Sequence, residues 1–179
     1  MSKNVLILAG SPRRGGNSDL LCDAFLRGAQ DAGNAVEKIF LQDKRIGFCS
    51  ACGVCYMERK PCVQDDDVAE IVDKMVAADV IVMSTPVYFY AMGGQMKTLI
   101  DRTIGRCMEL RGKEFCFIIA AHANNEATVE RVMTGFRGYL ACLPECVERG
   151  IVFGGGVFGA GEIADKPTVT EAYDAGRGV

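Results

Sequence analysis

The sequence has no tryptophan, one histidine and five prolines in 179 residues. No apolar run approaches the roughly 18 residues that a membrane-spanning helix needs, so we expect no membrane span. A strong positive charge is also missing: the net charge is −3, which argues against a nucleic-acid binder with a basic face. The first residues lead directly into an apolar strand, so we expect no signal peptide and a cytoplasmic protein.

The loop after this first strand lacks two well-known phosphate-binding motifs. It contains no Gly-Lys-Ser/Thr, which excludes a nucleoside-triphosphate loop. It also lacks the Gly-x-Gly-x-x-Gly pattern that marks a Rossmann dinucleotide site. No nucleophile–histidine–acid triad is evident either. That absence does not exclude an enzyme, because in hydride transfer a cofactor carries the chemistry and the protein needs no catalytic acid or base.

A turn suited to binding phosphate is nevertheless present at the N-terminus. The apolar strand 5–9 is followed by a Gly-, Ser- and Asn-rich segment and then by a helical pattern from Asp19. The start of such a helix offers unpaired N–H groups and the positive end of the dipole to an anion. The side chains that we expect to contact the phosphate are Ser11, Arg13, Asn17 and Ser18. The alternative is a tight turn that binds nothing.

Strands and helices alternate along the rest of the chain. We predict strands at 5–9, 35–41, 79–84, 114–121 and 147–153. Helices are predicted at 19–32, from 65–67 to 78, and at 93–106, 127–140 and 167–176. Nearly continuous apolar strands that alternate with helices indicate a parallel sheet covered on both faces. The fold class is therefore α/β, as a single domain over residues 1–179, with a cysteine-rich loop inserted at 42–64.

An aromatic segment, 86–94, follows the third predicted strand. In a parallel sheet this loop lies at the same edge as the loops 10–18 and 121–126, where ligands bind. Aromatic and apolar side chains there favour a planar ring. The alternative is that Phe89 and Tyr90 pack against a helix or a second subunit.

Taken together, these stretches resemble the flavodoxin-like NAD(P)H-dependent FMN reductases, and especially the branch related to iron–sulfur flavoproteins. The resemblance extends over nearly the whole chain and is specific at the level of the family. The matching stretches are 10–13 through 16–18, the cysteine segment 49–62 with Asp65-Asp66, Ala78-Asp79, 85–88, Lys97 and Asp101-Arg102.

The resemblance implies a flavodoxin-type doubly wound sheet of order 2-1-3-4-5 in a three-layer sandwich, with FMN bound non-covalently. It implies that the FMN phosphate meets the four residues named above and that NAD(P)H is the co-substrate. The ring would lie against Pro86, Val87, Tyr88, Tyr90 and Gly93, with Ala121 and His122 on its other side. A surface position is the alternative for His122. The family also implies a homodimer or homotetramer.

Four of the nine cysteines fall in one segment with the spacing Cys49-x2-Cys52-x2-Cys55-x6-Cys62. Four thiolates match a [4Fe–4S] cluster, which takes one per iron. Two alternatives remain: redox-active free thiols and a tetrahedral zinc site, although zinc sites usually have paired cysteine knuckles.

These observations predict an FMN-dependent NAD(P)H oxidoreductase that passes electrons to a quinone-like or other small acceptor, with the cluster as a possible intermediate carrier. A second hypothesis is an iron–sulfur flavoprotein that carries electrons between redox proteins. A third is a metal- or redox-sensing protein in which FMN is incidental.

Overall fold

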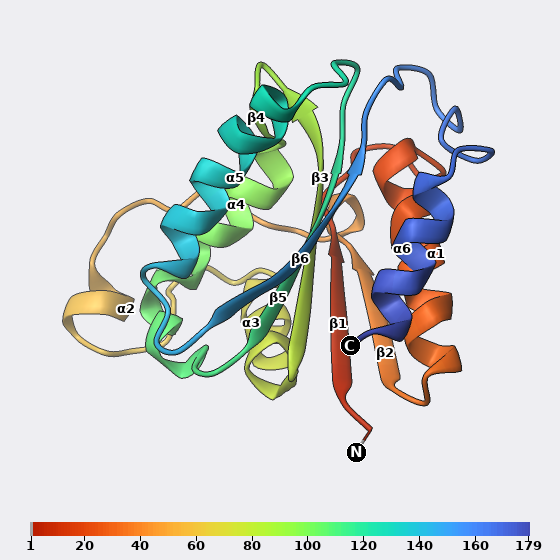
Figure 1. Ribbon diagram of the computed structural model, residues 1–179. Helices are drawn as coiled ribbons and strands as arrows, with labels where there is room; N and C mark the ends of the chain where they lie inside the picture. Colours follow the sequence, from red (N-terminus) through yellow and green to blue (C-terminus); the bar gives the residue numbers. More distant parts are fainter. Residues whose placement is uncertain (1) are drawn as a thin grey trace.

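Five long strands form the centre of the molecule. The computed structural model describes residues 2–179 and contains the strands β1 (Asn4–Ala9), β2 (Ala35–Phe40), β3 (Val80–Tyr88), β5 (Glu114–Ala120) and β6 (Val147–Gly154). They pair in parallel in the order β2-β1-β3-β5-β6. Counted along the chain, this is the predicted order 2-1-3-4-5, and the flavodoxin-like α/β fold is confirmed (Figure 1).

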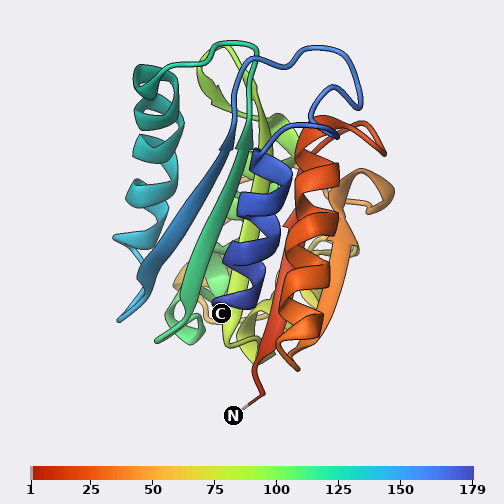
Figure 2. The same cartoon turned by 45° about the vertical axis from the view of Figure 1, so that its right-hand side comes forward.

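Helices cover both faces of the sheet, as Figures 1 and 2 show. One layer consists of α1 (Asn17–Asp31) and α6 (Thr168–Arg177); the other consists of α3 (Val68–Ala77), α4 (Gly94–Arg102) and α5 (Glu126–Leu140). Along β1, Val5 and Ile7 face the α1/α6 layer while Leu6 and Leu8 face the other. Burial on both faces explains why the strands read as unbroken apolar runs. In residues 2–179, no helix has both the length and the apolar character needed to cross a membrane.

The structure adds elements that the sequence pattern did not predict. The third predicted strand, 79–84, continues to Tyr88 and turns back into a short strand, β4 (Ala91–Met92), which pairs antiparallel with it. The sheet therefore has six strands rather than five. The predicted helix 93–106 ends at Arg102 and continues as 3-10 turns, Thr103–Gly105 and Cys107–Glu109. Another 3-10 turn, Leu41–Asp43, follows β2.

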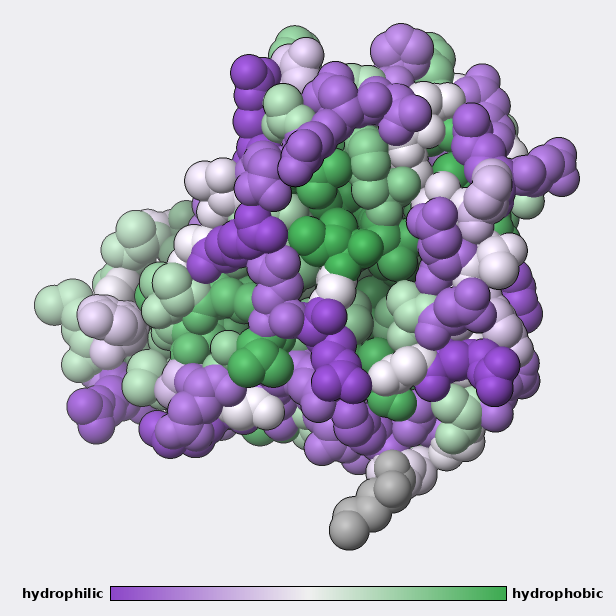
Figure 3. All heavy atoms as spheres, viewed as in Figure 1, coloured by the Kyte–Doolittle hydropathy of each residue, from purple (hydrophilic) through white to green (hydrophobic). Residues whose placement is uncertain are grey.

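The cysteine-rich loop projects from one side of the molecule and contains a short helix, α2 (Val54–Met57), at the left of Figure 1. Large apolar side chains around it are exposed to solvent, among them Phe48, Met57 and Met108. In the space-filling view, apolar surface gathers over this part of the molecule (Figure 3).

Two glycines set the distance between α1 and α6. A Cβ built on Gly28 would lie 2.0 Å from the carbonyl oxygen of Tyr173. A Cβ built on Gly176 would lie 2.1 Å from the carbonyl oxygen of Phe25. Both distances are far below van der Waals contact, and the opposing atoms belong to the backbone, which cannot swing aside as a side chain could. The helices therefore touch backbone to backbone.

We predict that Gly28→Ala lowers the free energy of unfolding by at least about 2 kcal/mol, because the added methyl group overpacks a rigid contact. Urea denaturation of the two proteins measures this difference. Gly138→Ala is the matched control, since a Cβ there has no neighbour within 4 Å. It should stabilise α5 by about 0.5–1 kcal/mol through helix propensity. Equal effects of the two substitutions would contradict the close helix contact.

Candidate functional site

The loop after β1 begins at a close approach between two strands. Gly10 donates its backbone N–H to the carbonyl oxygen of Ser84 at 2.9 Å. A Cβ on Gly10 would lie 2.5 Å from that same oxygen, so only glycine fits. The Ser11 hydroxyl then accepts a hydrogen bond from the Arg13 N–H at 3.0 Å and donates one to the Arg13 carbonyl at 2.9 Å. Ser11 therefore shapes the turn.

The start of α1 carries unpaired donors. Its first residue follows Gly16, which offers no capping side chain, so N–H groups of the first turn have no partner within the helix. The Ser18 hydroxyl beside them is buried, at 2% exposure of the residue, and has no hydrogen-bond partner in residues 2–179. A buried hydroxyl without a partner is unfavourable. The arrangement therefore fits an anionic group that accepts from these donors.

The carboxylate of Asp19, in the same turn, is neutralised by Lys38 of β2. The Asp19 carboxylate accepts the Gly15 N–H at 2.8 Å and lies 2.5 Å from the ammonium of Lys38. Lys38 also pairs with Asp23 at 2.6 Å. Burial alone would lower the pKa of Lys38, but its hydrogen bonds to the two aspartates outweigh this and raise the pKa. Because Lys38 stays charged, Asp19 can shape the loop without presenting an unpaired negative charge to an anion.

The side chain of Asn17 has a structural role. It donates to the carbonyl of Gly159 at 2.8 Å and accepts the N–H of Ile163 at 3.1 Å. The amide oxygen and one amide N–H are therefore engaged within the protein, and the second amide N–H and the backbone N–H of Asn17 are left for a ligand. Asn17 fastens the segment after β6 to the first loop.

These loops enclose a cavity of about 370 Å³ at the carboxyl edge of the sheet. All of the residues predicted to contact the cofactor line it except Tyr90 and Gly93. The lining residues are Ser11, Arg13, Asn17, Ser18, Pro86, Val87, Tyr88, Ala120, Ala121, His122, Val157 and Phe158. Polar donors from α1 thus lie at one part of the wall, and an apolar and aromatic surface forms another.

Three of the lining residues were not predicted: Ala120, Val157 and Phe158. Phe158 is exposed and meets His122 edge-on, with ring centroids 5.7 Å apart. The only available signal was the Gly-rich stretch after the last strand, because loops at strand carboxyl ends gather at one edge. That stretch also contains the Gly-x-Gly-x-x-Gly spacing, at Gly154, Gly156 and Gly159, but it leads into a loop and not a helix. It is therefore not a Rossmann fingerprint.

Tyr90 and Gly93 belong to the hairpin that forms the wall of this cavity. Gly93 donates its N–H to the Thr85 hydroxyl at 2.7 Å and so anchors the hairpin. Phe89 and Tyr90 form its two-residue turn, with φ of 49° and 62°. Positive φ at both positions defines a type I′ turn, which favours Asn-Gly. Here two bulky aromatic residues adopt it, and the Arg131 guanidinium lies 4.5 Å from the centre of the Tyr90 ring.

A second and larger cavity, of about 590 Å³, lies between the cysteine-rich loop and helices α4 and α5. Cys49, Cys52, Cys55 and Cys62 all line it, together with Cys107 and Cys142, which lie outside the four-cysteine motif. All of these thiols are free. In the part of the chain that the structure describes, no three His, Cys, Asp or Glu side chains are grouped to hold one metal ion.

The β3–β4 hairpin borders both cavities. Val87 and Tyr88 line the first cavity, while Met92, which pairs with Val87 across the hairpin, lines the second. One pair of strands therefore separates the donor-rich pocket from the thiol-rich one. On α4, Lys97 and Asp101 form an ion pair, with the ammonium nitrogen 2.6 Å from a carboxylate oxygen.

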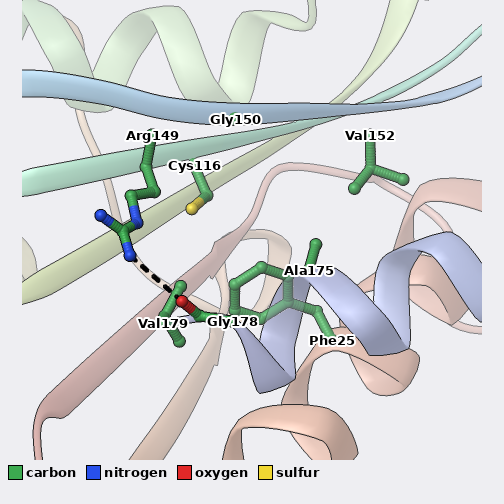
Figure 4. Close-up of a pocket in the computed structure, with 8 residues that line it drawn as sticks. All are labelled: Phe25, Cys116, Arg149, Gly150, Val152, Ala175, Gly178 and Val179. Atoms are coloured by element: carbon green, nitrogen blue, oxygen red, sulfur yellow. Dashed lines mark hydrogen bonds between the residues drawn. The ribbon is translucent and has the colours of Figure 1, made fainter.

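A third cavity, of about 200 Å³, lies away from these two, where β6 begins beside the end of α6 (Figure 4). Its wall includes Phe25, Cys116 and Val152, and Arg149 closes one side by donating to the carbonyl of Gly178 at 3.2 Å. Burial raises the pKa of Cys116 to about 12, which leaves an inert thiol. The cavities whose side chains suit a cofactor are therefore the first, with its polar donors, and the second, with its cysteines.

Comparison with known proteins establishes the family. The family model for NADPH-dependent FMN reductases matches residues 3–144. The chain belongs to this family. An iron–sulfur flavoprotein of Archaeoglobus fulgidus is 37% identical over 108 residues, which cover 59% of this chain and 49% of that protein. One of Methanocaldococcus jannaschii is 36% identical over 139 residues, covering 74% and 70%. The chain spans about half the length of the first of these relatives.

A solved structure supports the fold of this FMN reductase family member. The NAD(P)H:quinone oxidoreductase of Methanothermobacter marburgensis superposes with a TM-score of 0.79 at 20% identity, covering 99% of this chain and 96% of that one. At this identity the similarity establishes the shared fold alone.

We predict that replacing the hairpin turn by Asn-Gly, as Phe89→Asn with Tyr90→Gly, raises the free energy of unfolding by about 1–2 kcal/mol. The change relieves positive φ at two bulky residues, and the loss of the Arg131–Tyr90 contact offsets part of the gain. Thermal and urea unfolding give the difference. The control, Phe89→Ala with Tyr90→Ala, removes the rings but keeps the strain. An equal gain in stability from that control would show that relief of the positive φ angles is not the cause.

Proposed function

We propose that the protein is an FMN-dependent NAD(P)H oxidoreductase whose cysteine-rich loop holds an iron–sulfur cluster. The observation that carries this proposal is the shared hairpin. On one side of the hairpin lies a cavity suited to a phosphate and a planar ring. On the other side lies a cavity lined by cysteines. Membership of the FMN reductase family supports the flavin, and the names of the iron–sulfur relatives support the cluster.

The first cavity suits FMN through its donor set. The first turn of α1 and the Ser18 hydroxyl would bind the phosphate, with Arg13 adding positive charge at the rim. The apolar segment from Pro86 to Tyr88 would support the flavin ring, with Ala121 and His122 nearby. Bound FMN supplies two-electron chemistry with a nicotinamide and one-electron chemistry with other carriers. The protein residues bind, orient and shield it.

The second cavity suits a [4Fe–4S] cluster through the chemistry of its thiols. A cubane takes one thiolate per iron, so its ligands surround a volume and do not converge on one ion. The four motif cysteines line such a volume, whereas no single-ion site is formed among residues 2–179. Cys49, Cys52, Cys55 and Cys62 would hold the cluster, which would take and release one electron at a time.

The electron acceptor is a quinone-like or other small molecule in this proposal, a chemistry that the name of a similar structure supports. A second candidate is an electron carrier between redox proteins. The exposed apolar side chains around the cysteine loop favour it, because such patches mark interaction sites. The fully exposed Phe89 similarly favours a homodimer or homotetramer. The proposal places the protein in the cytoplasm, where thiols stay reduced.

We predict that Ser18→Ala weakens FMN binding about tenfold, because a hydrogen bond to a charged group contributes about 1.5 kcal/mol. Fluorescence titration of the apoprotein with FMN measures the dissociation constant. The apoprotein should not lose stability, since the hydroxyl has no partner. Ser11→Ala is the contrast, because that hydroxyl shapes the turn. An unchanged FMN affinity in Ser18→Ala would argue against phosphate at this helix start.

We predict that anaerobically purified protein contains FMN, iron and acid-labile sulfide, and that NADH or NADPH bleaches the flavin absorbance. A quinone should restore it. Cys62→Ser should lose the iron yet keep the flavin bleaching, whereas Cys142→Ser should keep both, because Cys142 lies outside the four-cysteine motif. Iron and sulfide analysis with stopped-flow absorbance tests both parts. Flavin that neither nucleotide reduces would refute the enzyme, and bleaching without iron would refute the cluster alone.

A further inference from the structure

Arg102, the last residue of α4, carries a buried charge beside the cysteine loop. Its side chain is 1% exposed, which is exceptional for an arginine. The guanidinium lines the same cavity as the four motif cysteines. Since a buried charge is costly unless it is fully partnered, its contacts indicate what it does.

Every contact of the guanidinium is to the cysteine-rich loop or its base. Two N–H groups form a bidentate pair with the carboxylate of Asp66, at 2.5 and 3.1 Å. The second N–H of Nη1 is shared between the carbonyl of Gly47 at 2.8 Å and the side-chain oxygen of Gln64 at 2.9 Å. The remaining contact is a hydrogen bond to the sulfur of Cys62 at 3.3 Å.

These bonds close the base of the loop. Asp66 also accepts the N–H of Gly47 at 3.0 Å, and Gln64 donates to the carbonyl of Phe48 at 2.9 Å. Segment 45–48, which enters the loop, is thereby joined to segment 64–67, which leaves it. Burial would raise the pKa of Asp66, but the Arg102 hydrogen bonds and the backbone N–H groups of Gly47 and Val68 outweigh this and lower it. The pair is therefore ionised at neutral pH.

Cys62 is the one motif cysteine that receives a side-chain hydrogen bond in the described residues. It is also separated from the other three by the longest gap, so its position depends most on the loop base. Hydrogen bonds to cluster sulfurs and nearby charge are two of the factors that set a cluster's reduction potential. The Arg102 side chain therefore both holds Cys62 in position and places a positive charge beside its sulfur.

We propose that Arg102 is a positioning residue that holds Cys62 in place as the fourth ligand and makes the cluster easier to reduce. This inference rests on the proposed function. A cluster held by Cys62 would gain one negative charge on taking one electron from the reduced flavin, and the Arg102 N–H directed at the Cys62 sulfur would stabilise that charge. Asp66 has the opposite effect, because its carboxylate offsets the arginine. The two partners of one ion pair are therefore predicted to shift the potential in opposite directions.

The test is a redox titration of the holoprotein followed by electron paramagnetic resonance. Arg102→Gln should lower the ratio of reduced to oxidised cluster at a fixed potential about tenfold, which is about 59 mV for one electron. Asp66→Asn should raise that ratio. Arg102→Lys, which keeps the charge but not the fork of donors, should restore part of the loss. Arg106→Gln is the matched control and should change nothing, since Arg106 bonds Asp73 and Glu109 but no cysteine.

Two further measurements keep the inference testable if Arg102→Gln takes up little iron. Gln64→Glu leaves the arginine in place, adds a negative charge beside it and should lower the potential. Hydrogen exchange on the apoprotein should show faster exchange of the Gly47 and Val68 amides in Arg102→Gln but not in Arg106→Gln, because both amides bond to Asp66.

Shifts of the potential in the same direction for Arg102→Gln and Asp66→Asn would overturn the inference, as would an unchanged potential in both. In either case Arg102 would only hold the base of the cysteine-rich loop closed, and the proposed function would be unaffected. A wild-type protein that takes up no iron would instead refute the cluster itself, and the two failures are thereby distinguished.

Discussion

The close approach of the carboxyl end of β1 to Ser84 in β3 is the constraint on which both cavities depend. Gly10 permits the hydrogen bond to Ser84 because no Cβ lies between the strands. From this junction one chain segment enters the α1 turn and the other continues into the hairpin. The hairpin returns to the same place, since a Cβ on Gly93 would lie only 3.7 Å from the carbonyl of Gly10. The donor-rich turn and the apolar wall are therefore held at a fixed distance by backbone contacts.

The polar residues of the first loop divide their work between structure and binding. Ser11, Asn17 and Asp19 are engaged within the protein and hold the loop in shape. Ser18 and the first backbone N–H groups of α1 are left as donors. Such preorganisation lowers the entropy that a ligand must overcome when it binds.

The sequence was sufficient for the fold and for most of the first cavity, because apolar runs and glycine-rich turns are local signals. The hairpin escaped prediction since Phe89-Tyr90 is not a residue pair that favours a type I′ turn. Phe158 and Cys142 escaped for another reason: only the fold brings them to the cavities from distant parts of the chain. The role of Arg102 depends on a bond to a loop some 40 residues earlier, which no spacing reveals. Asp66, which lies within the predicted helix start at 65–67, bonds the Val68 N–H and also pairs with that arginine.

The closed base of the cysteine loop has a consequence for how the family can diversify. Backbone and side-chain bonds join Arg45 to Asp67 at 2.7 and 3.0 Å, so the segment between them leaves and re-enters the fold at one point. Lengthening a loop whose ends are already fixed raises the entropic cost of closing it only slowly, by about 0.6 kcal/mol for each doubling of its length. Insertions or deletions there would leave the register of β2 and the start of α3 untouched. The segment between Arg45 and Asp67 can therefore change in length and sequence while the sheet keeps its shape.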